Sequence, residues 1–281
     1  MHNVLLEGGK LSMNVKQVTQ AILMKACGTR RIQPTCDRLV YGSEEMEVTG
    51  IVTTFMATAD VIKQAAELGA NMIVTHEPTW FTGADNEDWC RNDSVYRAKR
   101  ELLMHKGMAV WRFHDHMHMC DGPDLIYDGV VRQLGWQQYQ TTPDSPWLYD
   151  LPKMTLRELC RDIKQKLDME HLQVIGDPDM MCGRILLLVG GGSLGLGREE
   201  MPMEEMEKSG ADVMVCGDIT EWTTCAYIND AAQLGMRRAM IKLGHERSEE
   251  GGMKYLVPWL SECLPGVPVH FIDAKEPFQY L

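Results

Sequence analysis

Three short stretches of the chain place histidine beside a carboxylate. They are His76-Glu77, the run His114-Asp115-His116-Met117-His118 with Asp121 close behind, and the run from His245 to Glu249. Five of the nine histidines of the chain fall in these stretches. Mixed imidazole and carboxylate ligands suit a divalent ion such as Zn, Mn, Fe or Ni. The stretches therefore predict a metal site, with enough ligands for one or two ions.

Each stretch alone also has a simpler explanation. A single histidine at the end of a strand is commonly solvated or involved in capping, and Glu246 and Glu249 could form an acidic first turn that the helix dipole favours. The spacing of the run from His114 to His118 is not specific to any metal. The common placement favours the metal, because all three stretches follow strand patterns, where α/β folds usually assemble their sites.

The elements that must position these residues follow from the hydrophobic pattern. An apolar run over 71–75 predicts a buried strand that stops at His76, Glu77 and Pro78, since proline cannot donate to a strand ladder. Strands over 108–113 and 236–243 lead to His114 and His245 in the same way. If a helix starts at Glu246, His245 and Glu249 share one face of it. Further strands are expected at 50–55, 172–175 and 184–189, and helices at 13–23, 58–68, 94–106, 125–134, 155–167 and 226–234.

The order of these elements repeats along the chain. The segment 208–218 aligns with 67–77, since both contain a helix end, Gly-Ala-Asx, an apolar strand and a polar terminus. The helix, glycine and strand that lead to His245 likewise match those that lead to His114. Strands that alternate with helices favour an α/β fold. The repeated order predicts two related α/β halves.

A glycine pattern, Gly190-x-Gly192-x-x-Gly195, follows the strand expected at 184–189. A dinucleotide fingerprint should open a helix at once and meet an acidic residue about 20 residues later. Here Leu196-Gly197 delays the helix, and the candidate acid Asp212 lies in another Gly-Ala-Asx turn. A flexible turn or a phosphate-approach loop is the preferred interpretation, and no cofactor-binding residue is predicted. Cys216 is expected to be a small buried residue.

Composition restricts the partners. A net charge of −12 and a pI near 5.2 argue against direct nucleic-acid binding, so a small molecule or a protein is the expected partner. No run approaches the about 18 apolar residues of a membrane span, and the first 13 residues lack signal-peptide features. Nine scattered cysteines without a CxxC pair suggest reduced thiols and a cytoplasmic location. Residues 1–12 are expected to be an N-terminal extension, and 142–147 a linker.

Four motifs in this order resemble a known family. They are Gly69-Ala-Asn-Met-Ile-Val-Thr-His76-x-Pro78, His114-x-x-x-His118-x-x-x-Gly122, Gly210-Ala-Asp-Val-x-x-x-Gly217-Asp218 and Gly244-His245-x-x-Ser248-Glu249. Together they are similar to the NIF-three-like dinuclear metal-centre family, whose bacterial members are often described as GTP cyclohydrolase 1 type 2 homologues. The resemblance extends from about Met13 to the C-terminus.

The resemblance implies an α/β fold of two interlinked, pseudo-repeated lobes, about 13–140 with the C-terminal segment and about 150–220, with a metal site in the cleft between them and assembly as a homohexamer. By position, the metal ligands would be His76, Glu77, His114, His118, His245 and Glu249. Family members usually carry histidine at the position of Glu77 and aspartate at that of His118. A carboxylate can bridge two ions and a neutral imidazole normally cannot, so Glu77 or Glu249 is the expected bridge.

Two functions are compatible with these residues. The first is a metal-dependent hydrolase that acts on a nucleotide or a related small molecule; the family name points to GTP. Its candidate bases, or partners of a ligating histidine, are Glu77, Glu246 and Asp115. Arg247 and Lys242 are candidate phosphate contacts, although solvated charges are the more common interpretation. The second is a non-catalytic metal-binding scaffold or regulatory adaptor, suggested by the exchanged ligand pair.

Overall fold

The computed structural model describes residues 12–142 and 146–281. The chain forms two compact units, unit 1 (Met1–Ile126 and Met253–Ala274) and unit 2 (Tyr127–Gly252 and Lys275–Leu281). It passes between them within helices α5 (Leu125–Leu134) and α9 (His245–Cys263). The expected N-terminal extension, apart from Ser12, and residues 143–145 of the expected linker lie outside the described residues. Across the described ranges, no helix is both long enough and apolar enough to cross a membrane.

Unit 1 is built on a five-stranded sheet with strand order β1-β4-β3-β2-β10. Strands β4, β3, β2 and β10 run parallel, and β1 is an antiparallel edge. The strands are β1 (Arg38–Tyr41), β2 (Ile51–Thr54), β3 (Met72–Thr75), β4 (Ala109–Arg112) and β10 (Val269–Phe271). Because β2, β3 and β4 are buried on both faces, their sequences are continuous apolar or β-branched runs with few polar interruptions.

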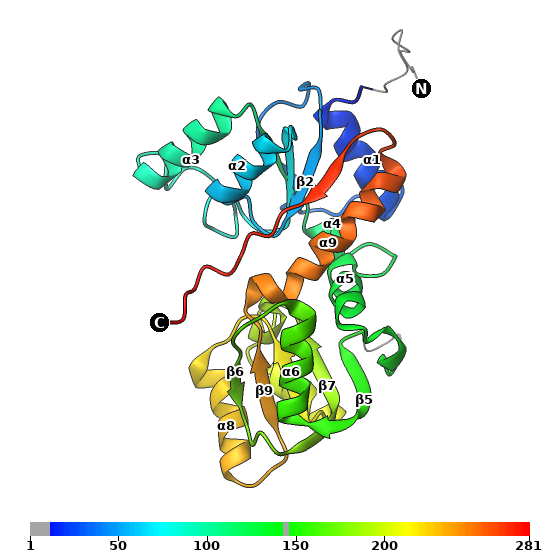
Figure 1. The fold of residues 1–281 in the computed structure, drawn as a ribbon, viewed down its shortest axis with the longest axis vertical. Coiled ribbons are helices and arrows are strands. Elements are labelled where there is room, and N and C mark those ends of the chain that lie inside the picture. The colour runs from blue at the N-terminus through cyan, green and yellow to red at the C-terminus, as the bar shows by residue number, and fades with distance from the viewer. Residues whose placement is uncertain (1–11, 143–145) are drawn as a thin grey trace. The chain divides into compact units, whose positions relative to one another are not determined.

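Helices cover both faces of this sheet. Figure 1 shows α2 (Ala59–Glu67) and α3 (Ser94–His105) on one side of β2, and α1 (Val15–Cys27) with the later part of α9 on the other. Ile62 of α2 and Leu103 of α3 pack with Ile73 of β3 in one buried cluster. Thr58 caps α2 as predicted, since its hydroxyl accepts a hydrogen bond from the backbone N–H of Val61 at 3.2 Å.

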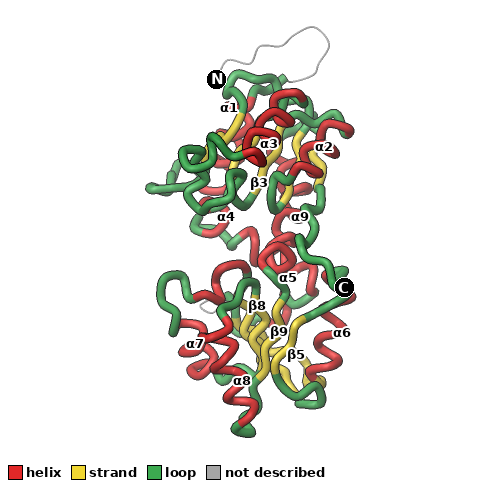
Figure 2. Tube along the Cα trace, turned by 90° about the vertical axis from the view of Figure 1, so that its left-hand side faces the viewer, coloured by secondary structure: helices red, strands yellow, loops and turns green. Residues whose placement is uncertain are grey.

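Unit 2 contains the second five-stranded sheet, with strand order β5-β7-β8-β9-β6. Its three central strands are parallel, and both edges are antiparallel. Figure 2 shows α6 on one side of the sheet and α7 and α8 on the other. The elements are β5 (Leu148–Thr155), α6 (Leu156–Leu167), β6 (Gln173–Ile175), β7 (Met181–Leu188), α7 (Met201–Ser209), β8 (Val213–Cys216), α8 (Ala226–Gln233) and β9 (Ala239–Lys242).

The two sheets confirm the predicted α/β class and the predicted repeat. Strands β3 and β8 come from the two aligned segments, and each lies between two parallel neighbours. Met72 at the start of β3 pairs with Ala109 of β4, and Val213 at the start of β8 pairs with Ala239 of β9. The strand pair β3–β4 of unit 1 and the strand pair β8–β9 of unit 2 therefore have the same direction and the same register.

The structure also corrects the sequence-based expectations. The sequence pattern did not predict strands β1, β5 and β10, which lie at sheet edges and are defined by distant pairing partners. The expectation that all cysteines are reduced is wrong for one pair, because Cys27 and Cys120 form a disulfide across 93 residues. Cys216 is a buried small residue as expected, and burial raises the pKa of its thiol to about 12.

Two helix backbones approach each other closely inside unit 2, and this contact predicts how a substitution there changes the stability of the protein. A Cβ atom on Gly129 of α5 would lie 2.4 Å from the carbonyl oxygen of Gly251 in α9. We expect Gly129→Ala to lower the free energy of unfolding by about 1–3 kcal/mol through this overlap, although alanine is favoured over glycine by about 1 kcal/mol in a helix. Urea unfolding would measure the change. Gly122→Ala, whose Cβ would meet nothing within 4 Å, is the control; a Gly129→Ala protein as stable as this control would contradict the prediction.

Candidate metal centre

His76 directly follows β3, at the carboxyl end of the unit 1 sheet. Its side chain is fully buried, and its Nδ1 lies 3.3 Å from the carbonyl oxygen of Phe113, which follows β4. A carbonyl oxygen can only accept, so the hydrogen bond requires the ring proton on Nδ1. In the neutral ring, Nε2 then carries an unprotonated lone pair, as a metal ligand requires.

His114 and His118 flank the short helix α4 (Asp115–His118) that follows β4. His114 Nδ1 lies 2.9 Å from Asp115 Oδ1, and His118 Nδ1 lies 2.8 Å from Asp124 Oδ2. Each carboxylate holds the imidazole proton on Nδ1 and fixes the orientation of the ring. Such outer partners accompany most metal-binding histidines, since they leave Nε2 available and make it more basic.

The three imidazoles converge on one point. The Nε2 atoms of His76 and His118 are 3.2 Å apart, and the rings of His76 and His114 stack with their centroids 4.5 Å apart. One possible ligand atom from each of His76, His114 and His118 lies within 4.8 Å of the others. Two facing lone pairs repel each other unless a proton or a cation lies close to both. The arrangement of these side chains therefore fits a metal ion.

Glu77 is held beside this cluster by Arg112, the last residue of β4. Glu77 Oε1 lies 3.7 Å from His114 Nε2, and Glu77 Oε2 lies 3.4 Å from Arg112 Nη2. Arg112 is itself buried and donates to the carbonyl oxygens of His76 and Gly83. A guanidinium fixed at several points directs the Glu77 carboxylate along the strand end.

Asp37 organises the whole segment that carries His114 and His118, and the sequence-based prediction missed it. Its carboxylate accepts hydrogen bonds from the backbone N–H groups of His114 at 2.7 Å, Asp115 at 2.8 Å and His116 at 3.1 Å. It also pairs with His116 Nδ1 at 2.8 Å. The Nε2 atom of His116 accepts from Ile32 N, so both ring nitrogens of His116 serve the structure.

The Asp115 carboxylate accepts hydrogen bonds from neighbouring residues. Burial tends to raise its pKa, but hydrogen bonds from Cys36 N and the His114 side chain outweigh this effect and lower the pKa to about 2. A carboxylate with so low a pKa is a weak base at neutral pH. Asp121, which follows the same run, pairs with Arg30 at the surface instead of joining the cluster.

Unit 2 contains a second histidine–carboxylate pair. His245 and Glu249 lie four residues apart on α9, as predicted, and His245 Nε2 is 3.2 Å from Glu249 Oε2. His245 Nδ1 is 2.8 Å from Oδ2 of Asp218, a residue that follows β8. This ring is thus anchored through Nδ1 in the same way as the histidines of unit 1.

The first glycine of the pattern after β7 leaves room for this pair. Gly190 has a φ of +51°, and a Cβ there would lie 1.9 Å from Glu249 Oε1 and 2.8 Å from His245 Nε2. Residues Gly190–Leu194 form a 3-10 helix, so the α-helix of a dinucleotide fingerprint does not start at this point. Asp212 precedes β8, at the opposite end of the sheet, and binds the backbone N–H groups of Gly183 and Arg184.

The remaining candidate residues of unit 2 form pairs of their own. Arg247 Nε lies 3.2 Å from Glu246 Oε2, and the same guanidinium contacts Glu250. Since the Arg247 side chain is 11% exposed, the expectation of a solvated charge is wrong there. Lys242 donates to Gln173 Oε1 at 2.9 Å.

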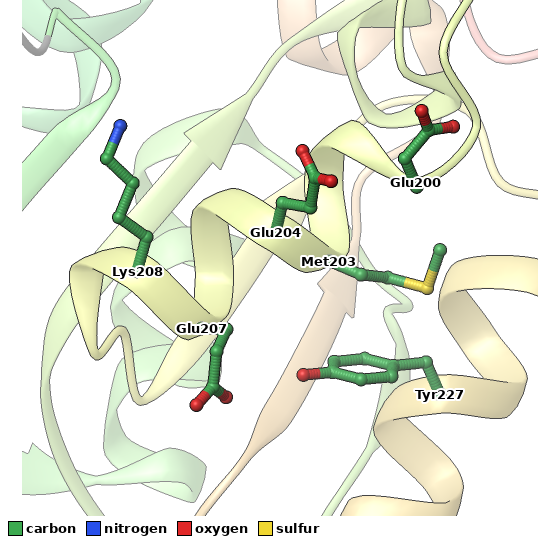
Figure 3. A pocket seen from close by; sticks show the side chains of 6 residues that line it. All are labelled: Glu200, Met203, Glu204, Glu207, Lys208 and Tyr227. Atoms are coloured by element: carbon green, nitrogen blue, oxygen red, sulfur yellow. The ribbon is translucent and has the colours of Figure 1, made fainter.

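A pocket of about 520 Å³ lies away from these residues, between α7 and α8 (Figure 3). Three of its side chains, Glu200, Glu204 and Glu207, come from the α7 region. Arg198 pairs with the first two, and Arg238 pairs with Glu207. These ion pairs already neutralise the acidic groups, and no predicted site residue lines the described pocket.

The fold and the cluster define an α/β protein with a candidate metal centre at the carboxyl end of a parallel sheet. The chain belongs to the Duf34/NIF3 (NGG1p interacting factor 3) family, whose model matches residues 13–277, so the resemblance seen in the sequence is confirmed.

Several known proteins are similar along most of the chain. A GTP cyclohydrolase 1 type 2 homolog of Clostridium perfringens is 26% identical over 255 residues, which cover 86% of this chain and 90% of the relative. A protein of the same description from Escherichia coli K12 is 24% identical over 240 residues, covering 85% and 88%. The crystal structure of a Bacillus cereus protein related to NIF3 matches 96% of this chain and 99% of its own, with a TM-score of 0.72 and 16% identity. This last similarity shows the fold alone.

Removal of the Asp37 carboxylate tests its role in holding α4. Asp37→Ala would leave three backbone N–H groups and the His116 ring without their acceptor, which should lower the free energy of unfolding by about 3 kcal/mol. We also expect faster hydrogen exchange at the amides of residues 114–116. Both measurements use chelator-treated protein, so that metal binding does not contribute.

Asp177→Ala is the control, because Asp177 accepts one local hydrogen bond, from Asp179 N, in an exposed turn. Unchanged exchange at residues 114–116 in Asp37→Ala would show that the carboxylate does not hold this segment.

Proposed function

We propose that the protein binds a divalent transition-metal ion through His76, His114 and His118, and that it acts as a metal-dependent hydrolase on a nucleotide or a related small molecule. The observation that carries the proposal is the 3.2 Å approach of two Nε2 atoms whose rings are both anchored through Nδ1. A neutral pair in this tautomeric state is unfavourable without a shared cation, and an N-rich site suits Zn, Mn, Fe or Ni.

Further ligands are proposed from each unit. Glu77 is the carboxylate next to the three imidazoles of unit 1, and His245 with Glu249 forms the ligand pair of unit 2. That both sets serve one dinuclear site stays a prediction from the resemblance. When bound, such an ion supplies Lewis acidity toward water and toward a carbonyl or phosphoryl oxygen of a substrate.

Among the three candidate bases, Glu77 is the one we propose. Asp115 is bound to His114 and Cys36 and has a pKa of about 2, which suits orientation of a ligand rather than proton transfer. Glu246 is buried and pairs with Arg247. Glu77 is partly buried, lies at the strand end 3.7 Å from His114 Nε2, and its carboxylate contacts Arg112 at 3.4 Å.

The substrate class comes from the relatives. Their shared description, GTP cyclohydrolase 1 type 2 homolog, supports a purine nucleotide as the first compound to test. The homohexamer and the cytoplasmic location implied by the resemblance stay predictions, which sedimentation and cell fractionation can test.

Metal binding is the first testable step. Reconstituted wild-type protein should retain at least one equivalent of a transition metal, measured by elemental analysis. Asp124→Asn should weaken binding about 10–100-fold, because it removes the carboxylate that anchors His118, and His118→Ala should weaken it further. Competition with a chromophoric chelator would give the affinities.

His105→Ala is the matched control, since His105 lies exposed at the end of α3, outside the clusters. Less than one equivalent in the wild type would reject the metal proposal. So would wild-type affinity in His118→Ala, or in a protein that combines His76→Ala with His245→Ala.

Catalysis is the second step. A panel of nucleotides and phosphoesters should show turnover that requires the metal and falls about 100-fold or more in Glu77→Gln, where the amide cannot accept a proton. Metal content measured on the same samples separates loss of the base from loss of the ion.

If the fully metal-loaded protein turns over none of these compounds, the hydrolase proposal fails. The metal-binding scaffold or adaptor would then be the function that the ligand cluster supports. Metal-dependent turnover that is lost in Glu249→Ala would reject the adaptor.

A further inference from the structure

A pocket of about 720 Å³ lies in unit 1 at the carboxyl ends of β2 and β3. Its wall comes from the β2–α2 connection and the start of α2, from the loop that follows β3, and from α3. Pro78, the residue after Glu77, contributes to the loop side. The volume is within the range of small-molecule sites, and the position beyond the carboxyl ends of parallel strands is where α/β folds commonly bind ligands.

The wall is mostly apolar, and part of the apolar surface is exposed. Met56, Pro78, Phe81 and Leu102 line the pocket, and Phe81 is 51% exposed. Phe81 also has a φ of +67°, a left-handed conformation that is unfavourable for an aromatic residue. An exposed aromatic side chain at the rim of an apolar cavity favours an organic ligand over a bare inorganic ion.

Lys99 is the buried charged residue among those that line the pocket. Its side chain is 9% exposed, and its ammonium donates to the carbonyl oxygen of Thr79 at 2.8 Å. The ammonium also lies over the rings of Phe81, at 5.1 Å, and Trp80, at 5.7 Å. An ammonium has three N–H donors, and the Thr79 carbonyl is the hydrogen-bond acceptor that the described residues offer it.

The buried charge is costly without an anion. Burial lowers the pKa of Lys99 to about 8, an effect that the Asp85 carboxylate partly opposes. Asp85 makes a hydrogen bond with Trp80 N at 2.6 Å and acts on Lys99 from a distance. No acidic side chain is among the described residues that line the pocket, whereas Lys63 adds a second positive charge at its exposed side. A negative group inside the pocket would therefore offset the cost of burying Lys99.

Two helix ends add to the positive field. The pocket is lined by Thr58 and Ala59 at the start of α2 and by Ser94 and Val95 at the start of α3. The N-terminal ends of helices carry partial positive charge and favour nearby anions. The caps Thr58 and Asp93 already accept some of the first N–H groups, so the ends support the lysine rather than replace it.

We propose that this pocket binds a small organic monoanion, a carboxylate with an aromatic or aliphatic body, whose acid group pairs with Lys99 and whose body lies against Phe81 and Leu102. The single buried ammonium can pair with one negative charge, and the apolar wall can pack against the uncharged part of the ligand. The site is separate from the metal ligands and does not require a bound ion.

Lys99 also has a structural contact, and the test must distinguish the two roles. The loop after β3 is held at other carbonyls as well, by Arg112 at Gly83 and by Arg38 at Ala84. Loss of the Thr79 contact alone should therefore leave the fold intact. Thermal unfolding of each variant checks this point directly.

The probe is 4-phenylbutyrate, with its neutral amide as the ligand control, both titrated into metal-free full-length protein by NMR. We expect the acid to bind at least about tenfold more tightly than the amide, as a charge-assisted hydrogen bond requires. Lys99→Met, which keeps the length of the side chain without its charge, should remove this preference. Lys106→Met, which changes an exposed lysine at the C-terminal end of α3 and outside the pocket, should keep it.

Ala98→Trp tests the cavity without changing its charge. Ala98 is an exposed residue of α3 that lines the pocket, so a large side chain there should fill the space and abolish binding of the acid while α3 remains folded. The proposal is overturned if acid and amide bind equally, or if the acid does not bind at concentrations up to about 10 mM. Unchanged binding of the acid in folded Lys99→Met or in Ala98→Trp would overturn it as well.

Discussion

The four histidines proposed as metal ligands are anchored through the same ring nitrogen. The Nδ1 atoms of His76, His114, His118 and His245 lie between 2.8 and 3.3 Å from a carbonyl or carboxylate oxygen. In the neutral ring each hydrogen bond fixes the tautomer, with Nε2 as the unprotonated nitrogen, and it also fixes the plane of the ring. In unit 1 this constraint directs three such nitrogens toward one point. Histidines that were only solvated would not require three rings with fixed orientations directed at one point.

The backbone supplies the positions that make the anchoring possible. His76 follows β3, and its Nδ1 meets the carbonyl of Phe113 because β3 and β4 are parallel and in register up to Thr75 and Arg112. In unit 2, Asp218 follows β8, and the pair on α9 meets it past the end of β9. The contact also depends on Gly190, since any side chain there would overlap the Glu249 carboxylate. The repeated architecture thus places a histidine–acid cluster after the corresponding strand in each unit.

The sequence was sufficient for the buried parallel strands and for the residues that follow them. A buried parallel strand is a continuous apolar run, so its end is visible without knowledge of its neighbours, and His76, His114 and His245 could be found in this way. The acceptors that orient them are a different case. Asp37 is 77 residues from His114 and precedes a short edge strand, and an aspartate before an edge strand has no local feature that distinguishes it from a solvated one. The disulfide between Cys27 and Cys120 depends on a contact across 93 residues for the same reason.

Glu77 and His118, the two residues that differ from the family pattern given by the resemblance, each have a partner that accounts for them. A ligating histidine at 118 needs an acceptor for its second nitrogen, and Asp124, six residues further along the chain, supplies it. A carboxylate at 77 lies in a partly buried position, and Arg112 of the neighbouring strand supplies a compensating positive charge at 3.4 Å. Each exchanged residue therefore has its own partner within unit 1, so the trade of an imidazole for a carboxylate is compatible with a metal centre. If Glu77 and His118 no longer served as metal ligands, the contacts of Arg112 and Asp124 with them would have no function at the site.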